Sequence, residues 1–264
     1  MRAFILAACL LLAACGGGGG DSASSTPPPP PPPPPPPAVS GDITLLFMGN
    51  SHTTFNDLPV MVAAMVRAAR PAMIVTPVLA PGWMFLEERA NDPAALQLLA
   101  SRDWSFVVLQ AQKYSTSGAF TYSIDGALEL IRRSRAAHAV PVLFPEWPRR
   151  DVPETQRIYD LHMSIAQREP ACVAPIGQAW DLALARFPAL ILHAPDGNHS
   201  APAGAFLAAL MIATTITGHP PETLAFIDGF EVDAETQARL RAVAAETALA
   251  HGPRLGCPND PVAP

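Results

Sequence analysis

The stretch Leu45–Asp57, LLFMGNSHTTFND, joins a run of apolar residues to a turn and then to two adjacent polar side chains. The apolar run has the composition of a buried strand, and it ends at Gly49-Asn50, a pair that favours a tight turn. Ser51 and His52 follow, but neighbouring side chains point to different faces of a strand or a helix. If Ser51 is a nucleophile, its base must therefore come from elsewhere in the chain.

The same pattern recurs from about Gly41 onward, where short apolar runs alternate with segments of helical periodicity. Such alternation predicts a parallel sheet with helices packed on both faces. The expected strands are 42–48, 72–82, 105–110, 140–147 and 172–177, and the expected helices are 57–70, 92–101, 123–138, 153–168, 178–187, 202–217 and 233–251. We therefore expect one α/β domain, a three-layer α/β/α sandwich around a mainly parallel, flavodoxin-like sheet of about five strands.

The N-terminus carries the features of an export signal. Arg2 precedes a short apolar segment ending in LLAAC, which resembles a bacterial lipobox with Cys15 as the lipidated residue. An ordinary signal peptide cleaved nearby is the alternative. Five glycines and then eleven prolines, Pro27–Pro37, follow the cysteine. A flexible tether would thus lead into a stiff rod of about 34 Å.

These features divide the chain into four parts. They are a lipoprotein signal peptide (1–14), a lipid-anchored Gly/Ser/Pro-rich linker (15–40), a folded domain (41–255) and a C-terminal tail (256–264). We expect an exported, membrane-anchored lipoprotein of the bacterial cell envelope. The segment 205–217 is apolar almost all round, but it is too short to span a membrane and is expected to be a core helix.

Charge and cysteine content narrow the class of protein further. The chain has a formal net charge of −6 and scattered arginines, so no basic face for nucleic acid is expected. No Cys or His spacing is typical of a zinc site. Cys9 falls in the signal and Cys15 at the lipidation site, which leaves Cys172 and Cys257 in the folded part. An oxidising compartment favours a disulfide between them.

Two loops at the expected carboxyl edge of the sheet, where ligands bind in such folds, carry catalytic residue types. Ser51 follows a glycine turn at a helix start, where backbone N–H groups suit an oxyanion, although serine there also commonly caps the helix. In HAPDGNHSAPAGAF, residues 193–206, Asp196 stands three residues before His199. A carboxylate at this spacing can fix the tautomer of the imidazole, whose other nitrogen can then accept a proton from a serine. His52, His162 and His193 are rival candidates for the base, but they have no such orienting acid nearby.

Taken together, LLFMGNSHT and the downstream APDGNHSAPAGAFLAAL resemble the SGNH (GDSL-like) hydrolase superfamily over about residues 43–218. In that superfamily a nucleophilic serine follows the first strand, and an Asp-x-x-His block lies near the C-terminus. The glycine of its second block corresponds to Gly82. The asparagine of its third block corresponds to Gln112, and Gln110 could exchange roles with Gln112. Asn50 also departs from the pattern, because the best-known branch has aspartate there.

The resemblance implies a serine esterase that hydrolyses carboxylic esters and needs no metal or organic cofactor. Ser51 would be the nucleophile, His199 its base, and Asp196 the residue that orients the imidazole. The N–H groups of Ser51 and Gly82 and the side-chain amide of Gln112 would form the oxyanion hole. The expected substrates are acetyl esters of carbohydrates. The lipid anchor would hold the enzyme at the membrane, from which it would reach them.

Two other functions fit part of the pattern. The altered third block is compatible with a non-catalytic SGNH-like surface module that binds glycans or partners. Gly197-Asn198-His199 also occurs in metallophosphoesterases, but the Asp-x-His and Gly-Asp ligand blocks that such a two-metal site needs are missing from this sequence. In the esterase interpretation, His52 is a bystander whose side chain points away from that of Ser51.

We predict that the mature protein begins at a lipidated Cys15. Mass spectrometry of the membrane fraction should find a diacylglycerol-sized increment on this residue. Replacing the thiol in Cys15→Ser should release the protein from the membrane and leave its thermal unfolding curve unchanged, because the linker separates Cys15 from the folded domain. A soluble wild-type protein with an unmodified N-terminus at another position would contradict this prediction.

Overall fold

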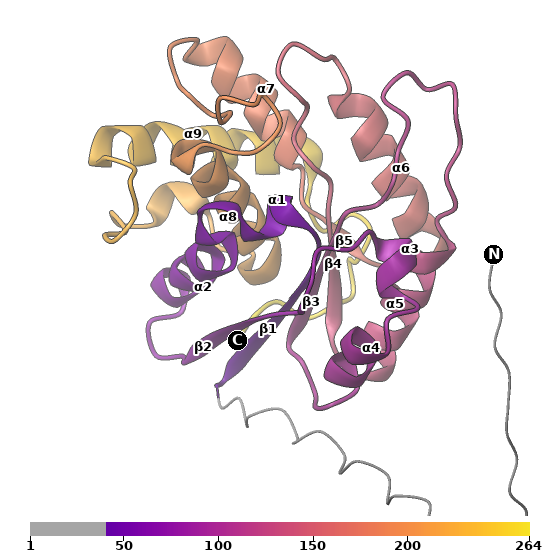
Figure 1. The fold of residues 1–264 in the computed structure, drawn as a ribbon. Coiled ribbons are helices and arrows are strands. Elements are labelled where there is room, and N and C mark those ends of the chain that lie inside the picture. Colours follow the sequence, from indigo (N-terminus) through magenta and orange to yellow (C-terminus); the bar gives the residue numbers. More distant parts are fainter. Residues whose placement is uncertain (1–40) are drawn as a thin grey trace, which may run out of the picture. The chain divides into compact units, whose positions relative to one another are not determined.

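The computed structural model describes residues 41–264, and the signal peptide, lipidation site and linker assigned to 1–40 lie outside these residues. In the described part, five parallel strands form one sheet in the order β2-β1-β3-β4-β5 (Figure 1). The strands are β1 (Ile43–Met48), β2 (Val75–Leu79), β3 (Phe106–Gln110), β4 (Val140–Phe144) and β5 (Cys172–Val173). The α/β architecture expected from the sequence is confirmed.

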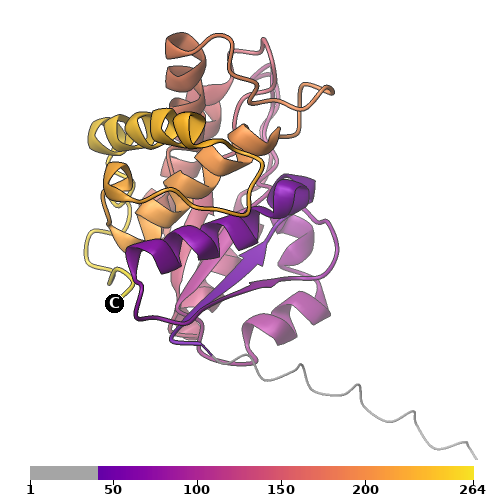
Figure 2. The same cartoon turned by 90° about the vertical axis from the view of Figure 1, so that its left-hand side faces the viewer.

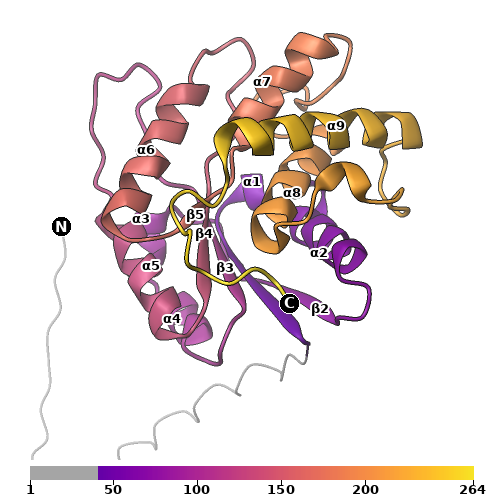
Figure 3. The same cartoon turned by 180° about the vertical axis from the view of Figure 1, so that it is seen from behind.

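Helices cover both faces of the sheet, so that two cores flank it. On one face lie α2 (Leu58–Ala69), α7 (Ile176–Arg186), α8 (Pro202–Thr217) and α9 (Ala234–His251), the layer nearest the viewer in Figure 2. On the other lie α3 (Leu86–Arg89), α4 (Pro93–Leu99), α5 (Asp125–Ala136) and α6 (Thr155–Arg168) (Figure 3). In β1, Ile43 and Phe47 face the first core, whereas Leu46 and Met48 face the second. Burial on both faces explains the unbroken apolar run of this strand.

Helix α8 is a core helix, as its sequence predicts. From Gly204 to Thr217 every one of its residues is buried, because the helix packs against α2, α7, α9 and β4. An apolar helix without a polar face is suited to such a position. Among residues 41–264, no helix combines the length and the apolar character needed to cross a membrane.

The structure also contains short elements that the sequence did not indicate. A one-turn helix, α1 (Ser51–Thr54), and a 3₁₀ turn, η1 (Phe55–Asp57), precede α2, and a second 3₁₀ turn, η2 (Pro221–Thr223), follows α8. Asn56 and Asp57 have positive φ angles of 55° and 51°, which breaks the helical path between α1 and α2. The segment after β1 therefore forms a separate turn, so that Ser51 does not begin a long helix.

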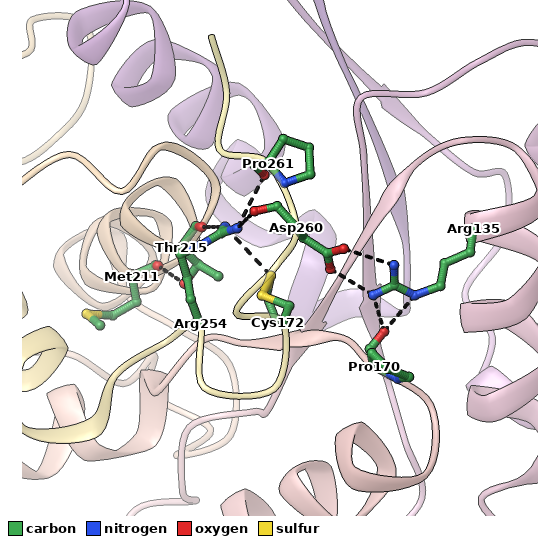
Figure 4. The surroundings of a disulfide bond; sticks show 9 residues. Arg135, Pro170, Cys172, Met211, Thr215, Arg254, Asp260 and Pro261 are labelled. Carbon is green, nitrogen blue, oxygen red and sulfur yellow. Dashed lines mark hydrogen bonds and ion pairs between the residues drawn. A yellow bond between two sulfur atoms is a disulfide. The ribbon is translucent and has the colours of Figure 1, made fainter.

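The C-terminal tail is fastened to the domain by a disulfide. Cys172, at the start of β5, is bonded to Cys257, so the expected pairing is confirmed. Figure 4 shows Arg254 and Asp260 beside this bond. Arg254 donates to the Thr215 carbonyl at 2.9 Å, and Arg135 forms an ion pair with Asp260 at 2.7 Å. The tail is therefore packed against the body of the domain.

We predict that removing the disulfide destabilises the domain without unfolding it at room temperature. The bond joins residues 85 positions apart, and closing such a loop contributes about 4 kcal/mol in the chain-entropy account. A double variant, Cys172→Ala with Cys257→Ala, should lose about 2–5 kcal/mol of unfolding free energy in urea. Reductant should lower the wild type to a similar value and leave the double variant unchanged. Equal stability of oxidised wild type and variant would refute the prediction.

Candidate active site

The turn after β1 is shaped by a glycine that allows close packing. A Cβ at Gly49 would collide with the Thr53 hydroxyl and the Gln110 side-chain oxygen, so no other residue fits this position without rearrangement. Asn50 caps the short helix α1, since its side-chain oxygen accepts the His52 N–H at 3.1 Å. Ser51 is thus the first residue of α1. It caps no helix here, and its hydroxyl is directed to another loop.

Gln110, the last residue of β3, holds this turn in place. Its side-chain oxygen accepts hydrogen bonds from the Asn50 N–H and the Thr53 hydroxyl, both at 2.8 Å. Its amide nitrogen donates to Glu146 at 2.5 Å. The side chain is fully buried, and the following residue, Ala111, has a positive φ of 78°, a conformation that costs a non-glycine residue energy. Gln110 therefore links the ends of three neighbouring strands.

The loop that carries Asp196 and His199 is fixed from outside by two residues of the segment after β4. The Trp147 indole donates to the Asn198 carbonyl at 2.9 Å, and the Arg150 N–H donates to the Gly197 carbonyl at 2.8 Å. Gly197 has a φ of 72°, which glycine adopts without strain. These bonds define the path of the loop and present His199 toward α1.

Ser51, His199 and Asp196 form a continuous chain of hydrogen bonds. His199 Nε2 lies 2.9 Å from Ser51 Oγ, across 148 residues of sequence, and His199 Nδ1 lies 2.5 Å from Asp196 Oδ2. The second carboxylate oxygen accepts the N–H groups of Asn198 and His199, each at 2.9 Å. The His199 hydrogen bond and these two amides keep the pKa of Asp196 far below its usual range. The carboxylate is therefore ionised and oriented toward the imidazole.

Two rings stack on the His199 imidazole. The Phe55 ring lies 4.0 Å from it between centroids, with a 13° angle between planes, and the His52 ring lies 5.1 Å away at 30°. His52 was expected to be a bystander whose side chain points away from that of Ser51. In the structure, its ring lies beside the imidazole to which Ser51 is hydrogen-bonded.

A cleft with a volume of about 530 Å³ opens beside these residues, a size typical of small-molecule sites. It is lined by Asn50, Ser51, His52, Phe85, Gln112, Lys113, Tyr114, Thr116, Tyr122, Glu146, Arg149, Asn198 and His199. A second hollow of about 570 Å³, between the ends of α8 and α9, includes neither Ser51 nor His199. We therefore assign the first cleft to the candidate site.

The charged groups of the cleft are largely compensated. Lys113 pairs with Glu87 at 3.1 Å, and Arg149 pairs with the buried Glu154 at 3.2 Å. Burial, and then the nearby Glu146 and Glu154 carboxylates, raises the pKa of Tyr114, which therefore remains a neutral phenol. The cleft presents mainly aromatic faces and hydrogen-bonding groups, with no unpaired lysine or arginine among its described residues.

The other two residues expected in the oxyanion hole, Gln112 and Gly82, are less clearly placed for that role than Ser51. Both hydrogens of the Gln112 amide are donated, to the carbonyls of Lys113 and Ser123, each at 3.0 Å. An oxyanion role for Gln112 would require one of these bonds to break. Gly82 does not line the cleft, although Arg89 ties its carbonyl and that of Gly49 together, at 2.8 and 3.0 Å. Within residues 41–264, the N–H groups of Ser51 and Gly82 donate to no other group.

One cluster of possible metal ligands occurs in the described part of the chain, formed by Cys172, Cys257 and Asp260. The two sulfur atoms are joined in the disulfide, so they are not available as thiolate ligands. At the candidate active site, Asp196 and His199 are hydrogen-bonded to each other. The metal ligand set of a two-metal phosphoesterase is therefore not assembled around His199 in residues 41–264.

Comparisons with known proteins agree with the fold. No established protein family and no curated protein matches the sequence. A proposed SGNH hydrolase from Slackia heliotrinireducens is 27% identical, with a TM-score of 0.52 over 66% of this chain and 98% of its own. A DUF4886 family protein from Bacteroides uniformis ATCC 8492 is 16% identical, with a TM-score of 0.60 over 83% of this chain and 96% of its own. The chain thus has an SGNH hydrolase-like fold, which supports the resemblance seen in the sequence.

We predict that Gln110→Met releases the turn that carries Ser51. The substitution keeps the length of the side chain but removes a buried acceptor and donor, leaving the Asn50 N–H and Glu146 without their partner. The unfolding free energy should fall by about 2–4 kcal/mol, since each buried group left unpaired costs about 1–3 kcal/mol. Hydrolysis of a nitrophenyl ester, the activity expected from the sequence, should fall as well, because Ser51 is no longer held against His199.

The matched control is Gln237→Met. Gln237 is equally buried and is bonded to the backbone of Ile227 and Val232, away from the cleft. This variant should lose comparable stability in urea while its turnover stays near that of the wild type. If both variants lost turnover equally, the specific link between Gln110 and the turn would be refuted.

Proposed function

We propose that this chain is a serine esterase that hydrolyses carboxylic esters through Ser51, His199 and Asp196. The observation that carries the proposal is the pair of hydrogen bonds from Ser51 Oγ to His199 Nε2 and from His199 Nδ1 to Asp196 Oδ2. This arrangement of nucleophile, base and orienting acid is what acyl transfer requires. An SGNH hydrolase-like fold, reported for a similar structure, points to the same chemistry.

In the first half-reaction, Ser51 Oγ attacks the ester carbonyl while His199 Nε2 accepts its proton. The ionised Asp196 stabilises the imidazolium that forms. The carbonyl oxygen becomes an oxyanion, for which the N–H group of Ser51, the first residue of α1, is the proposed donor. The tetrahedral intermediate then collapses. The bond to the alcohol oxygen breaks, and His199 gives its proton to that oxygen.

In the second half-reaction, water takes the place of the alcohol. His199 again accepts a proton, now from water, and the resulting hydroxide adds to the acyl carbon bound to Ser51. Collapse of this intermediate releases the carboxylic acid and returns the proton to Ser51 Oγ. Atoms and protons balance over the cycle, so no metal or redox group is required by this mechanism.

The substrates we propose are acetyl esters of carbohydrates. Glu146, Asn198 and the neutral Tyr114 phenol offer hydrogen-bond partners for hydroxyl groups, and Tyr122 and Phe85 offer faces on which a sugar ring can stack. The many polar groups in the cleft make a long acyl chain a poor fit. A lipid anchor at Cys15 and the proline-rich linker would present the domain at the surface of a membrane in the cell envelope.

We predict that Ser51→Ala and His199→Ala each remove nearly all turnover of 4-nitrophenyl acetate. The double variant should be scarcely slower than either single variant, because the residues act as one unit. Asp196→Asn should retain the fold and lose about 10²–10⁴-fold in kcat, because the imidazole loses its tautomer and its orientation. A chain-length series of nitrophenyl esters, measured beside acetylated glycans, would define the acyl group.

Two further measurements separate the rival functions. Labelling of Ser51 by a fluorophosphonate, found in the wild type and absent in Ser51→Ala, would support an enzyme over a binding module. Turnover should persist in EDTA, whereas a metallophosphoesterase would lose it. Full turnover of the best ester by Ser51→Ala would falsify the proposed function.

A further inference from the structure

A continuous series of rings in contact, all stacked except the tilted pair of His52 and Trp147, runs from the site into the core. Phe55 stacks on His199, His199 on His52, and His52 contacts Trp147 at 5.1 Å between ring centroids. Trp147 then lies parallel to Trp180 at 4.7 Å, with a 4° angle between the rings. Trp147 and Trp180 are buried, so the inner end of the series is part of the packed interior.

His52 is the ring that joins the imidazole of the site to this interior. Only 7% of His52 is exposed, and its Nδ1 atom is buried without a hydrogen-bond partner among the described residues. A buried polar atom of this kind costs free energy that a phenylalanine would not. The unpaired Nδ1 atom therefore adds nothing to the stability of the core, and what the ring contributes at this position is its contact with His199.

We propose that His52 is a positioning residue that sets the orientation of the His199 imidazole, an inference that rests on the proposed esterase function. His52 adjoins Ser51 in the chain, and its N–H is bonded to the cap residue Asn50. Its ring and the nucleophile therefore belong to the same rigid turn. Because the His52 ring stacks on His199, the turn fixes the position of His199 as well as that of Ser51.

Trp147 completes this arrangement from the other side. Its ring contacts His52, and its indole N–H holds the Asn198 carbonyl in the loop of His199. Trp147 therefore contacts the ring that lies on His199 and also holds the loop that carries His199. The angle and distance of the hydrogen bond from Ser51 Oγ to His199 Nε2 would depend on these contacts, because Phe55 and His52 are the only rings beside the His199 side chain in the described chain.

The test compares ring-bearing and ringless substitutions in the full-length protein. His52→Phe keeps a ring between His199 and Trp147, whereas His52→Leu fills a similar space without one. We expect His52→Leu to lower kcat for 4-nitrophenyl acetate by about 10–100-fold, since a small displacement of a catalytic group has effects of this size. KM should change by less than about twofold, and His52→Phe should retain kcat within about threefold.

The matched control is His162→Ala. His162 is a fully buried histidine in α6 whose pKa is lowered to about 4 by burial, and it does not line the cleft. This variant should lower the melting temperature and leave kcat unchanged. His52→Met provides a second ringless side chain if His52→Leu does not fold. The rate of Ser51 labelling by a fluorophosphonate should follow kcat in all the His52 variants.

The outcomes distinguish this proposal from the proposed function. Slow ringless variants beside an active His52→Phe would support positioning by the ring. A folded His52→Leu or His52→Met with wild-type kcat would overturn it, and so would a His52→Phe as slow as the ringless variants. In either case, loss of activity in Ser51→Ala would show that the proposed esterase function still holds. If Ser51→Ala hydrolysed the ester normally, the proposed function itself would fail.

Discussion

The hydrogen bonds that the Gln110 side chain accepts from the turn after β1 are the constraint on which the site depends. Strands β1 and β3 are neighbours, so the last residue of β3 reaches the backbone of Asn50 and the hydroxyl of Thr53 directly. Such contact is possible only because Gly49 has no side chain in the way. The sheet itself therefore sets the position of Ser51, which does not depend on a mobile loop. A nucleophile on a rigid element is held more accurately than one on a mobile segment.

Much of the fold could be predicted from the sequence because the sheet is buried on both faces. Its central strands are unbroken apolar runs, and the helices between them show a clear period, so both kinds of element were recognisable. The residues Ser51, Asp196 and His199 were also found from local sequence, since the carboxyl ends of parallel strands converge at one edge. The structure brings these three side chains into contact, as such convergence suggests.

What could not be predicted is where individual side chains direct their polar groups. Gln110 and Gln112 looked interchangeable in the sequence, but the positive φ of Ala111 between them breaks the alternation of a strand. Gln110 consequently faces the turn of Ser51, while Gln112 donates to the Ser123 carbonyl eleven residues further on. An alanine gives no signal for this backbone conformation, which tertiary contacts impose.

In the proposed function, one part of the site would perform the chemistry and another would contact the substrate. The residues proposed for the chemistry lie in two short segments, which Gln110 and Trp147 hold by hydrogen bonds. The longer connection between β3 and α5 contributes Lys113, Tyr114 and Tyr122 to the lining of the cleft. Long loops change more readily than the elements that carry them. If the chain is the proposed esterase, selection for a different substrate could therefore remodel this connection and leave the hydrogen bond between Ser51 and His199 unaltered.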